Sequence, residues 1–345
     1  WQFGRVLRIK TPSTKDIGYV QRTLAEFLLP FIMYFRFKRS SIFNSPVGGV
    51  VFYSPTIFFG PLIRRLKRHF SCKAYLIVRD MFPDWALDLG VIKKGLPYYL
   101  LKRVELDQYR VADRIGVQCP GNLLLLPEHK AIGNKAEVLW NWMGPAASRE
   151  LACPIRLSET HLVGRKVFVY AGNMGVAQGM GVFMELAQRL LPRSDIGFLF
   201  VGRGSDAQLL RKIAADKGLE NVVFFDEIDP SEIPALYAQC HAGLVALDPR
   251  HRTHNIPGKF LSYMQCGLPV LASINPGNDL VGLIDGERVG KVSVSTNAEE
   301  LAGLALALMQ QIEADAGISE RCQALAASLF SPVTTVRQIA GALSE

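Results

Sequence analysis

The sequence predicts an α/β protein with two doubly wound, parallel-sheet domains that face each other across a cleft. The chain has 345 residues, which is too long for one ordinary core and fits two domains of about 150 residues each. From residue 50 onward, short apolar segments alternate with amphipathic helical segments, as in parallel βαβ units. The alternation stops over residues 143–164 and then starts again, so we interpret that segment as an interdomain linker.

The first domain, residues 1–142, contains four predicted strands. They lie in the segments GGVVFYSP, KAYLIV, RIGVQC and AEVLW, and helical segments such as GPLIRRLKRHF separate them. A complete doubly wound domain needs one more strand and a helix or two. We therefore expect the first domain to be truncated at its N-terminus, before Trp1.

The second domain, residues 165–328, contains six predicted strands. They are VFVYAG, IGFLFVG, VVFF, AGLVAL, PVLAS and KVSV. Helices are predicted between them near 180–191, 205–217, 231–240, 257–266 and 278–284. Two longer helices follow at about 297–315 and 318–328, and a last one near 331–344.

Charge is divided unevenly along the chain. Residues 1–150 hold 23 Lys and Arg against 11 Asp and Glu, whereas the remainder holds 16 against 20. A basic half favours an anionic partner, such as membrane lipid or a phosphorylated acceptor, unless it serves solubility alone. Nucleic acid is not expected, since the sequence has no recognition-helix motif and no basic strand with interleaved aromatics.

The most apolar segment, residues 24–43, is too short to span a bilayer. Its longest uncharged run, residues 27–35, is interrupted by Pro30, whereas about 20 residues are needed to span. Aromatic residues beside Arg36, Lys38 and Arg39 suit a segment that lies on a membrane, and a core helix with a basic end is the alternative. Six scattered cysteines without a CxxC pair indicate reduced thiols in the cytoplasm.

Two glycine turns follow strands of the second domain. In YAGNMGVAQG, residues 170–179, a strand ends at glycines and a helix then begins. Backbone N–H groups at Gly172–Gly175 and the helix dipole can hold an anion there without a cationic side chain. The second turn, FVGRG, places Gly202 and Arg203 after the next strand. The alternative is that both are tight turns of structural value only.

The segment 244–273 carries the strongest indication of an anion site. A strand ends at Asp248, and Pro257 and Gly258 open a helix, with the proline expected at the first helical position. Lys259 lies in the first turn, where the helix dipole disfavours a cation, so an anion nearby is expected. Ser262 lies on the same face. The loop between this strand and this helix contains Arg250, His251, Arg252 and His254, but two histidines without a third ligand do not predict a metal site.

Two carboxylates follow a strand of the first domain. Asp80 and Asp84 in RDMFPDWALD are placed to position or deprotonate an acceptor hydroxyl, or they are loop and cap carboxylates.

Six segments stand in order over about residues 50–275: YSPTIFFGPL, RDMFPDWALDLG, VQCPGN, YAGNMGVAQG, FVGRG and IPGKFLSYMQCGLPVLA. Together they resemble the GT-B glycosyltransferases of family 4, most closely the bacterial branch that transfers N-acetyl-fucosamine-type sugars in O-antigen or capsule assembly. The resemblance implies two Rossmann-like domains and transfer with retention at the anomeric carbon. It also implies a UDP-sugar as co-substrate, no tightly bound cofactor, no metal, and a C-terminal segment, residues 329–345, that packs back on the first domain.

The resemblance also implies roles for residues. Lys259 and Arg203 would supply positive charge to the donor diphosphate, with Arg250 or Arg252 as further help. Asp80 and Asp84 would act on the acceptor. The remaining donor-binding residues would be Gly172, Asn173, Met174, Gly175, Gln178, Gly202, Ile228, Pro257, Gly258 and Ser262.

The sequence departs from the family at two pairs of positions. The family commonly has Arg and Lys where Asn173 and Gln178 stand, and two glutamates where His254 and Ser262 stand. The replaced pairs keep open a catalytically weak or inactive nucleotide-sugar-binding subunit. A non-hydrolysing UDP-sugar epimerase is the other alternative, because such enzymes also pair two Rossmann-like domains.

The partners that the resemblance implies are a nucleotide-sugar donor and a polyprenyl-diphosphate-linked saccharide acceptor. Such an acceptor places the protein in the cytoplasm, peripheral at the anionic inner-membrane surface.

Overall fold

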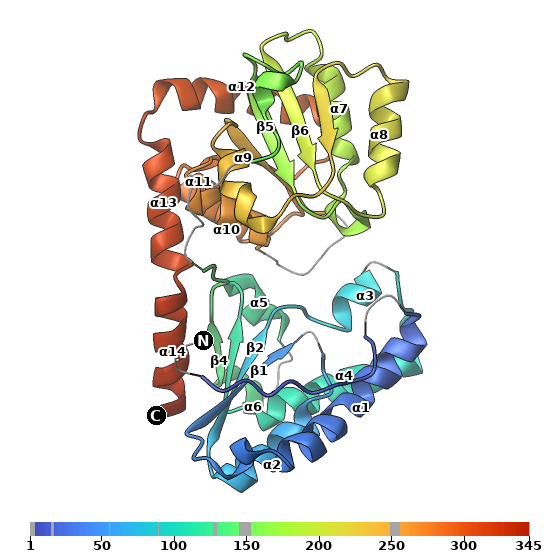
Figure 1. Cartoon of the computed structure of the whole chain (residues 1–345), viewed down its shortest axis with the longest axis vertical. Helices are drawn as coiled ribbons and strands as arrows, with labels where there is room; N and C mark the ends of the chain where they lie inside the picture. The colour runs from blue at the N-terminus through green and yellow to red at the C-terminus, as the bar shows by residue number, and fades with distance from the viewer. Residues whose placement is uncertain are drawn as a thin grey trace. The chain divides into compact units, whose positions relative to one another are not determined.

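The computed structural model describes residues 4–14, 17–54, 56–88, 90–126, 130–144, 153–248 and 256–344. The chain forms two compact units, the first made of Trp1–Leu139 and Val336–Glu345 and the second of Trp140–Thr335. Each unit has its own parallel β-sheet (Figure 1). The α/β fold class and the two sheets that the sequence predicts are confirmed. Part of the expected linker, residues 145–152, lies outside the described residues.

The first unit is built on a four-stranded sheet in the order β1-β2-β3-β4. Its strands are β1 (Gly49–Ser54), β2 (Lys73–Val78), β3 (Arg114–Val117) and β4 (Ala136–Val138), all parallel. Its helices are α1 (Tyr19–Lys38), α2 (Gly60–Phe70), α3 (Asp84–Asp88), α4 (Leu96–Val111), α5 (Pro120–Leu125) and α6 (Lys130–Gly133). The strand β2 is buried along most of its length, which explains its continuous apolar sequence.

The helix α1 continues through Pro30 and has 20 residues. Sequence reasoning treated this proline as an interruption, but the helix forms around it. Several apolar side chains of α1 remain exposed, with 75% of the surface of Val20, 58% of Leu24 and 61% of Phe35 accessible. In the part of the chain that the structure describes, no helix combines the length and the apolarity that crossing a bilayer requires.

The second unit is built on a six-stranded parallel sheet in the order β10-β9-β8-β5-β6-β7. Its strands are β5 (Lys166–Ala171), β6 (Ile196–Val201), β7 (Val222–Phe225), β8 (Ala242–Ala246), β9 (Val270–Ser273) and β10 (Gly290–Ser293). Numbered within the unit, this is the doubly wound strand order 3-2-1-4-5-6. The chain adds strands on one side of β5 first and then on the other, so the topological switch point lies between β5 and β8. All six predicted strands are present.

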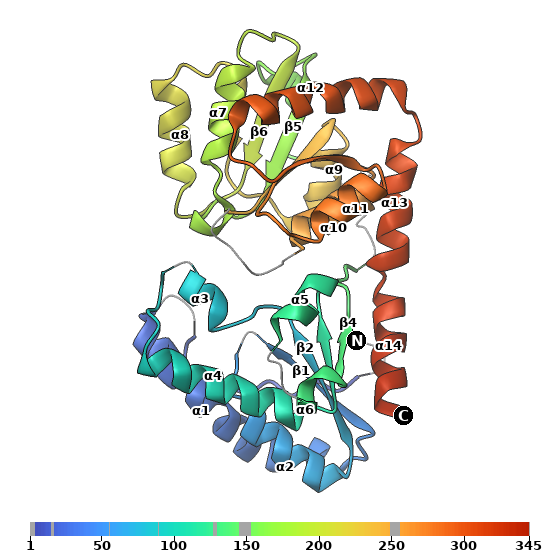
Figure 2. The same cartoon turned by 180° about the vertical axis from the view of Figure 1, so that it is seen from behind.

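Helices cover both faces of this sheet, and α12 packs against α7 on one of them (Figure 2). The helices of the unit are α7 (Gly181–Arg189), α8 (Ala207–Asp216), α9 (Ile233–Tyr237), α10 (Gly258–Gln265), α11 (Leu280–Gly286), α12 (Ala298–Ala314) and α13 (Ile318–Leu329). The core beneath α7 contains Phe168 stacked on Phe198, with ring centroids 5.4 Å apart. The last helix, α14 (Pro332–Ser344), donates from Gln338 to Glu137 and to the Val138 carbonyl beside β4, both at 2.9 Å.

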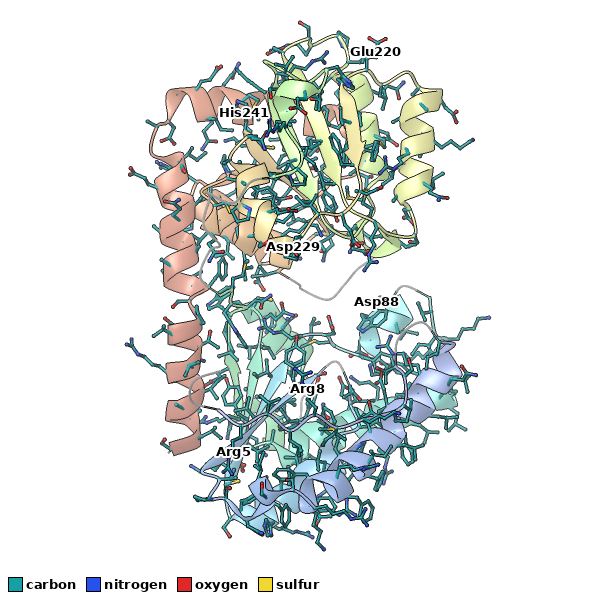
Figure 3. The ribbon with its side chains drawn as sticks, viewed as in Figure 1. Arg5, Arg8, Asp88, Glu220, Asp229 and His241 are labelled. Atoms are coloured by element: carbon teal, nitrogen blue, oxygen red, sulfur yellow. The ribbon has the colours of Figure 1, made fainter. Side chains whose placement is uncertain are left out.

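Because all strands of the second unit run in one direction, their carboxyl ends share one edge of the sheet. Asp229, four residues beyond β7, lies at that edge, whereas Glu220 lies at the opposite edge (Figure 3). His241 precedes β8 and accepts a hydrogen bond from the Val167 amide at 3.1 Å. A ligand site of this fold is therefore expected near Asp229 and not near His241.

Candidate functional site

A pocket of about 540 Å³ lies at the carboxyl ends of β5, β6 and β7, at the switch point of the second unit. Eight residues that the sequence predicts for the site line it: Gly172, Asn173, Gly202, Arg203, Ile228, Gly258, Lys259 and Ser262. They come from four chain segments that are far apart in the sequence. Parallel-strand order brings these segments together, because each follows the end of a strand at the same edge of the sheet.

The two predicted glycine turns form one interlocked structure. Gly172 donates to the Val201 carbonyl and Met174 donates to the Arg203 carbonyl, both at 2.8 Å. Gly202 has a φ of +138°, and a Cβ on it would lie 2.1 Å from the Gly172 carbonyl oxygen. Only glycine allows both that backbone conformation and that approach. The second turn therefore holds the backbone of the first turn in place.

Most backbone amides of the first turn already have acceptors. Gly172 and Met174 donate to the second turn, and Gly175 donates to the Gln178 side-chain oxygen at 3.0 Å. Among the described residues, the Asn173 amide alone of the four is left without an acceptor. The structure thus differs from the expected cradle of four amides, because the neighbouring turn and Gln178 take up three of them.

Two of the predicted donor-binding side chains stabilise the turn without lining the pocket. Met174 is fully buried in the core of the unit. The Gln178 side-chain oxygen accepts from the Gly175 amide and from the Asn173 side chain, the latter at 3.2 Å. Gln178 therefore fixes the direction of Asn173, which does line the pocket.

Lys259 is the central charged group of the pocket. Its ammonium lies 4.5 Å from the centroid of the Tyr170 ring, a cation–π contact. A Cβ on Gly172 would lie 3.0 Å from the Lys259 Nζ atom, so glycine at 172 makes room for the ammonium. Desolvation by burial lowers the pKa of Lys259 to about 8. No carboxylate of the described residues forms a salt bridge with it, so a bound anion would supply its missing counter-charge.

Lys259 reaches the pocket from the first turn of α10. Pro257 is the N-cap of this helix, one position earlier than the sequence reasoning placed it, and Gly258 is the first helical residue. Gly258, Lys259 and Ser262 line the pocket, whereas Pro257 only sets the start of the helix. The candidate residues Arg250, His251, Arg252 and His254 lie outside the described residues. Among the residues that are described, no cluster of His, Cys, Asp or Glu could hold a metal.

Arg203 is exposed at the rim of the pocket and already has a counter-ion. Its Nε atom lies 2.8 Å from Glu227, with 80% of the arginine side chain and 55% of the glutamate side chain accessible. Glu227 lines the pocket beside Ile228 but was not among the predicted site residues. Its position two residues after the apolar run VVFF was the feature that could have identified it.

The predicted acceptor residues belong to the first unit and have different surroundings. Asp84 accepts hydrogen bonds from Tyr98 and Lys102, both at 2.8 Å. Lys102 also pairs with the buried Glu105, which accepts from Tyr109 at 2.9 Å. Asp84 therefore belongs to a hydrogen-bonded network whose lysine already balances its charge.

Asp80 is exposed and lines a separate cavity of about 280 Å³. The walls of this cavity include Phe58, Phe82, Trp85 and Leu101. Of the two predicted carboxylates, Asp80 is thus the one beside a space that a ligand can enter.

Known proteins resemble this chain in sequence and in fold. Residues 165–311 match the family described as "Glycosyl transferases group 1". The chain is 26% identical over 232 residues to "Probable glycosyltransferase WbjE" of Pseudomonas aeruginosa, covering 65% of this chain. It is 29% identical over 248 residues, 67% of this chain, to WcaI of Escherichia coli (strain K12), whose name places it in colanic acid biosynthesis as a glycosyl transferase. The chain spans 57% of the length of each of these relatives.

Solved structures share the fold at low sequence identity. Anabaena Alr3699/HepE, solved in complex with UDP and glucose, has a TM-score of 0.66 at 17% identity, over 86% of this chain and 77% of that chain. The sucrose-phosphate synthase (tll1590) of Thermosynechococcus elongatus has a TM-score of 0.69 at 14% identity, over 97% of this chain and 81% of that chain. The chain therefore has the GT-B fold, and the part of it that matches the group 1 glycosyltransferase family is residues 165–311.

Proposed function

We propose that the chain is a retaining glycosyltransferase (EC 2.4) that moves a hexose from a UDP-sugar to a lipid-linked saccharide in cell-surface polysaccharide synthesis. The finer assignment is an N-acetylated deoxyhexose as the transferred sugar and a polyprenyl diphosphate as the lipid carrier. The observation that carries the proposal is the Lys259 ammonium, half-buried at the switch point of a group 1 domain without a carboxylate partner among the described residues. A donor diphosphate supplies the missing negative charge.

The chemistry requires that charge to be met. As the bond between the sugar and UDP breaks, the sugar becomes oxocarbenium-like and negative charge grows on the diphosphate. Lys259 faces this charge with an ammonium that is protonated at pH 7, since its pKa is about 8. The Asn173 amide adds a preorganised hydrogen bond, and Ile228 borders the space for the base. Gly172 and Gly202 hold these groups in place through the interlocked turns.

The acceptor is expected on the first unit. Asp80, exposed beside an apolar cavity, accepts a hydrogen bond from the acceptor hydroxyl and orients it. Asp84 contributes through position only, because Lys102 and Tyr98 occupy its oxygens.

Peripheral attachment to the cytoplasmic face of the membrane is part of the proposal. It is supported by the exposed apolar residues of α1, among them Leu24, Phe27 and Phe35, together with Arg36 and Lys38 in its last turn. The name of WcaI, with its reference to colanic acid biosynthesis, supports the assignment to surface polysaccharide.

The direct test incubates the protein with a panel of UDP-sugars and a lipid-linked acceptor extract. Mass spectrometry is expected to detect an extended acceptor, and free UDP is expected to appear only when the acceptor is present. Binding of a UDP-sugar without turnover would favour the inactive binding subunit instead. Interconversion of UDP-sugars without an acceptor would favour the epimerase.

The matched variants are Lys259→Ala and Lys212→Ala. Loss of one charged contact to the leaving group is expected to cost about 2–4 kcal/mol, or about 30- to 1000-fold in turnover. Lys212 is 74% exposed and pairs with Asp216, so its removal is expected to leave turnover unchanged. Turnover of Lys259→Ala within a few-fold of the parent would contradict the assigned role of the ammonium.

A further inference from the structure

We propose that a basic pocket in the first unit binds the phosphate group of an anionic membrane phospholipid. The pocket, of about 500 Å³, lies between the N-terminal segment and the second half of α1. It is separate from the donor pocket of the second unit and from the cavity beside Asp80. The inference deepens the proposed membrane attachment, on which it rests, by naming the residues and the lipid chemistry.

All the charged residues that line this pocket are basic. Lys10, Arg36 and Arg39 line it, and no Asp or Glu occurs among its described lining residues. Across the described part of the chain, none of the three forms a salt bridge, whereas Arg22 on the same helix pairs with Glu26 at 2.8 Å. Arg5 and Arg8 lie on the same N-terminal segment as Lys10 and add positive charge to this region (Figure 3). Cations converging on an open cavity without a carboxylate favour an anionic ligand.

The apolar part of the lining points to a lipid and not to a free anion. Phe31, Ile32 and Phe35 line the same pocket, and 61% of the surface of Phe35 is accessible. Leu28, one turn before Ile32, is 48% exposed. An exposed apolar surface next to unpaired cations matches a ligand with a phosphate and an acyl chain, which a sugar phosphate or inorganic phosphate does not offer.

The helix dipole is another explanation for basic residues at the end of α1, but it does not account for the whole pocket. Cations in the last turn of a helix favourably complement its dipole, and Arg36 and Lys38 occupy that turn of α1. The dipole does not explain why Lys10 approaches the same cavity from a separate segment. Phospholipid phosphate explains all three cations together.

The experiment measures binding of the full chain to vesicles of phosphatidylcholine with and without phosphatidylglycerol. Strong binding is expected only with phosphatidylglycerol, and salt is expected to weaken it. The double variant Arg36→Gln/Arg39→Gln is expected to bind about 30-fold more weakly, about five-fold for each cation removed near an anionic surface. The control, Arg68→Gln/Arg103→Gln, removes two exposed arginines of the same unit that do not line the pocket, and it is expected to bind as the parent does.

Three outcomes would overturn the inference. Equal losses in the two double variants would mean that diffuse charge, and not the pocket, attracts the vesicles. Full binding by Arg36→Gln/Arg39→Gln would remove the pocket from the interaction. Inorganic phosphate bound at the pocket without any vesicle binding would assign it to a soluble anion. UDP binding, measured by calorimetry on the same proteins, is expected to be unchanged, so a failure here leaves the transferase proposal standing.

Discussion

Lys259 is expected to strengthen UDP binding but to lower the stability of the free folded protein. Lys259→Met keeps a long side chain but removes the ammonium. In the wild type, desolvation lowers the pKa of Lys259 from 10.5 to about 8, so the folded protein holds this charge less favourably than the unfolded chain does. We therefore expect Lys259→Met to be more stable than the wild type at pH 7 and to have lost its affinity for UDP.

The size of the gain follows from the pKa. The lowered value corresponds to about 3 kcal/mol at pH 7, at about 1.4 kcal/mol for each pH unit. Partial exposure of the side chain and loss of the contact with Tyr170, about 0.5–1 kcal/mol, reduce this to about 1–2 kcal/mol. For a unit of this size, that is an increase in Tm of about 2–8 °C.

The dependence on pH gives the prediction its sign. Folded Lys259 loses its proton near pH 8, and unfolded Lys259 loses it near 10.5, so the unfolded state binds more protons between these values. The wild type is therefore stabilised as pH rises through this window, and the advantage of Lys259→Met disappears toward pH 10.5.

Thermal denaturation with and without UDP measures both effects. UDP at about 100 times its Kd is expected to add about 2.7 kcal/mol of stability to the wild type and none to Lys259→Met. The control is Lys212→Met, whose lysine is 74% exposed and whose Tm is expected to change little. A Tm of Lys259→Met below that of the wild type at pH 7 would refute the reasoning, because the ammonium would then be well compensated in the free protein.

Three further predictions concern the supporting structure. Gly202→Ala is expected to lower the free energy of unfolding by about 3 kcal/mol or more and to abolish UDP binding, because its Cβ would lie 2.1 Å from a carbonyl oxygen. The control Gly303→Ala, at a helical site with open space, is expected to raise the free energy of unfolding by about 0.5–1 kcal/mol, as chemical denaturation measures. Burial raises the pKa of Glu105 to about 6, so stability is expected to fall by about 2 kcal/mol as pH rises from 4.5 to 6, and Glu105→Gln is expected to lack this slope in urea titrations. Arg203→Ala removes an exposed ion pair, so it is expected to change stability by less than about 1 kcal/mol and to weaken UDP binding, measured by calorimetry, far less than Lys259→Ala does.

The sheet of the second unit could be predicted almost completely from the sequence. The four central strands of its parallel sheet, β5, β6, β8 and β9, are buried on both faces, and such strands appear as continuous apolar runs with glycine or proline at their ends. The edge strands β7 and β10 are only partly buried, but they are apolar enough to be recognised as well. The location of the site could be predicted as well, because parallel strands bring their carboxyl ends to one edge. Helix α1 was harder, since Pro30 lies inside it and sequence rules place a helix boundary near a proline.

The details of the site could not be predicted, because they depend on contacts between segments far apart in the sequence. A glycine-rich turn offers free amides only if no neighbouring strand end takes them, and here the Val201 and Arg203 carbonyls accept two. Asp84 follows a strand as Asp80 does, yet Lys102, from another helix, pairs with it. A sequence pattern gives the edge of the sheet on which a residue lies, but not which of its hydrogen bonds are already made.

These contacts explain why so much of the function is assigned to one lysine. Among the described residues that line the donor pocket, Arg203 and Lys259 are the cations and Glu227 is the carboxylate, and Arg203 is already paired with Glu227. Asn173 and Gln178 provide no charge, and the Gln178 side-chain oxygen is already engaged by the turn. Lys259 is then the charge of the described lining still available to a diphosphate. In a pocket with both an arginine and a lysine, two side chains stabilise the leaving-group charge, so removing one cation lowers turnover less. No second unpaired cation occurs in the described lining of this pocket. The effect of Lys259→Ala on turnover is therefore expected at the upper end of the range for one charged contact.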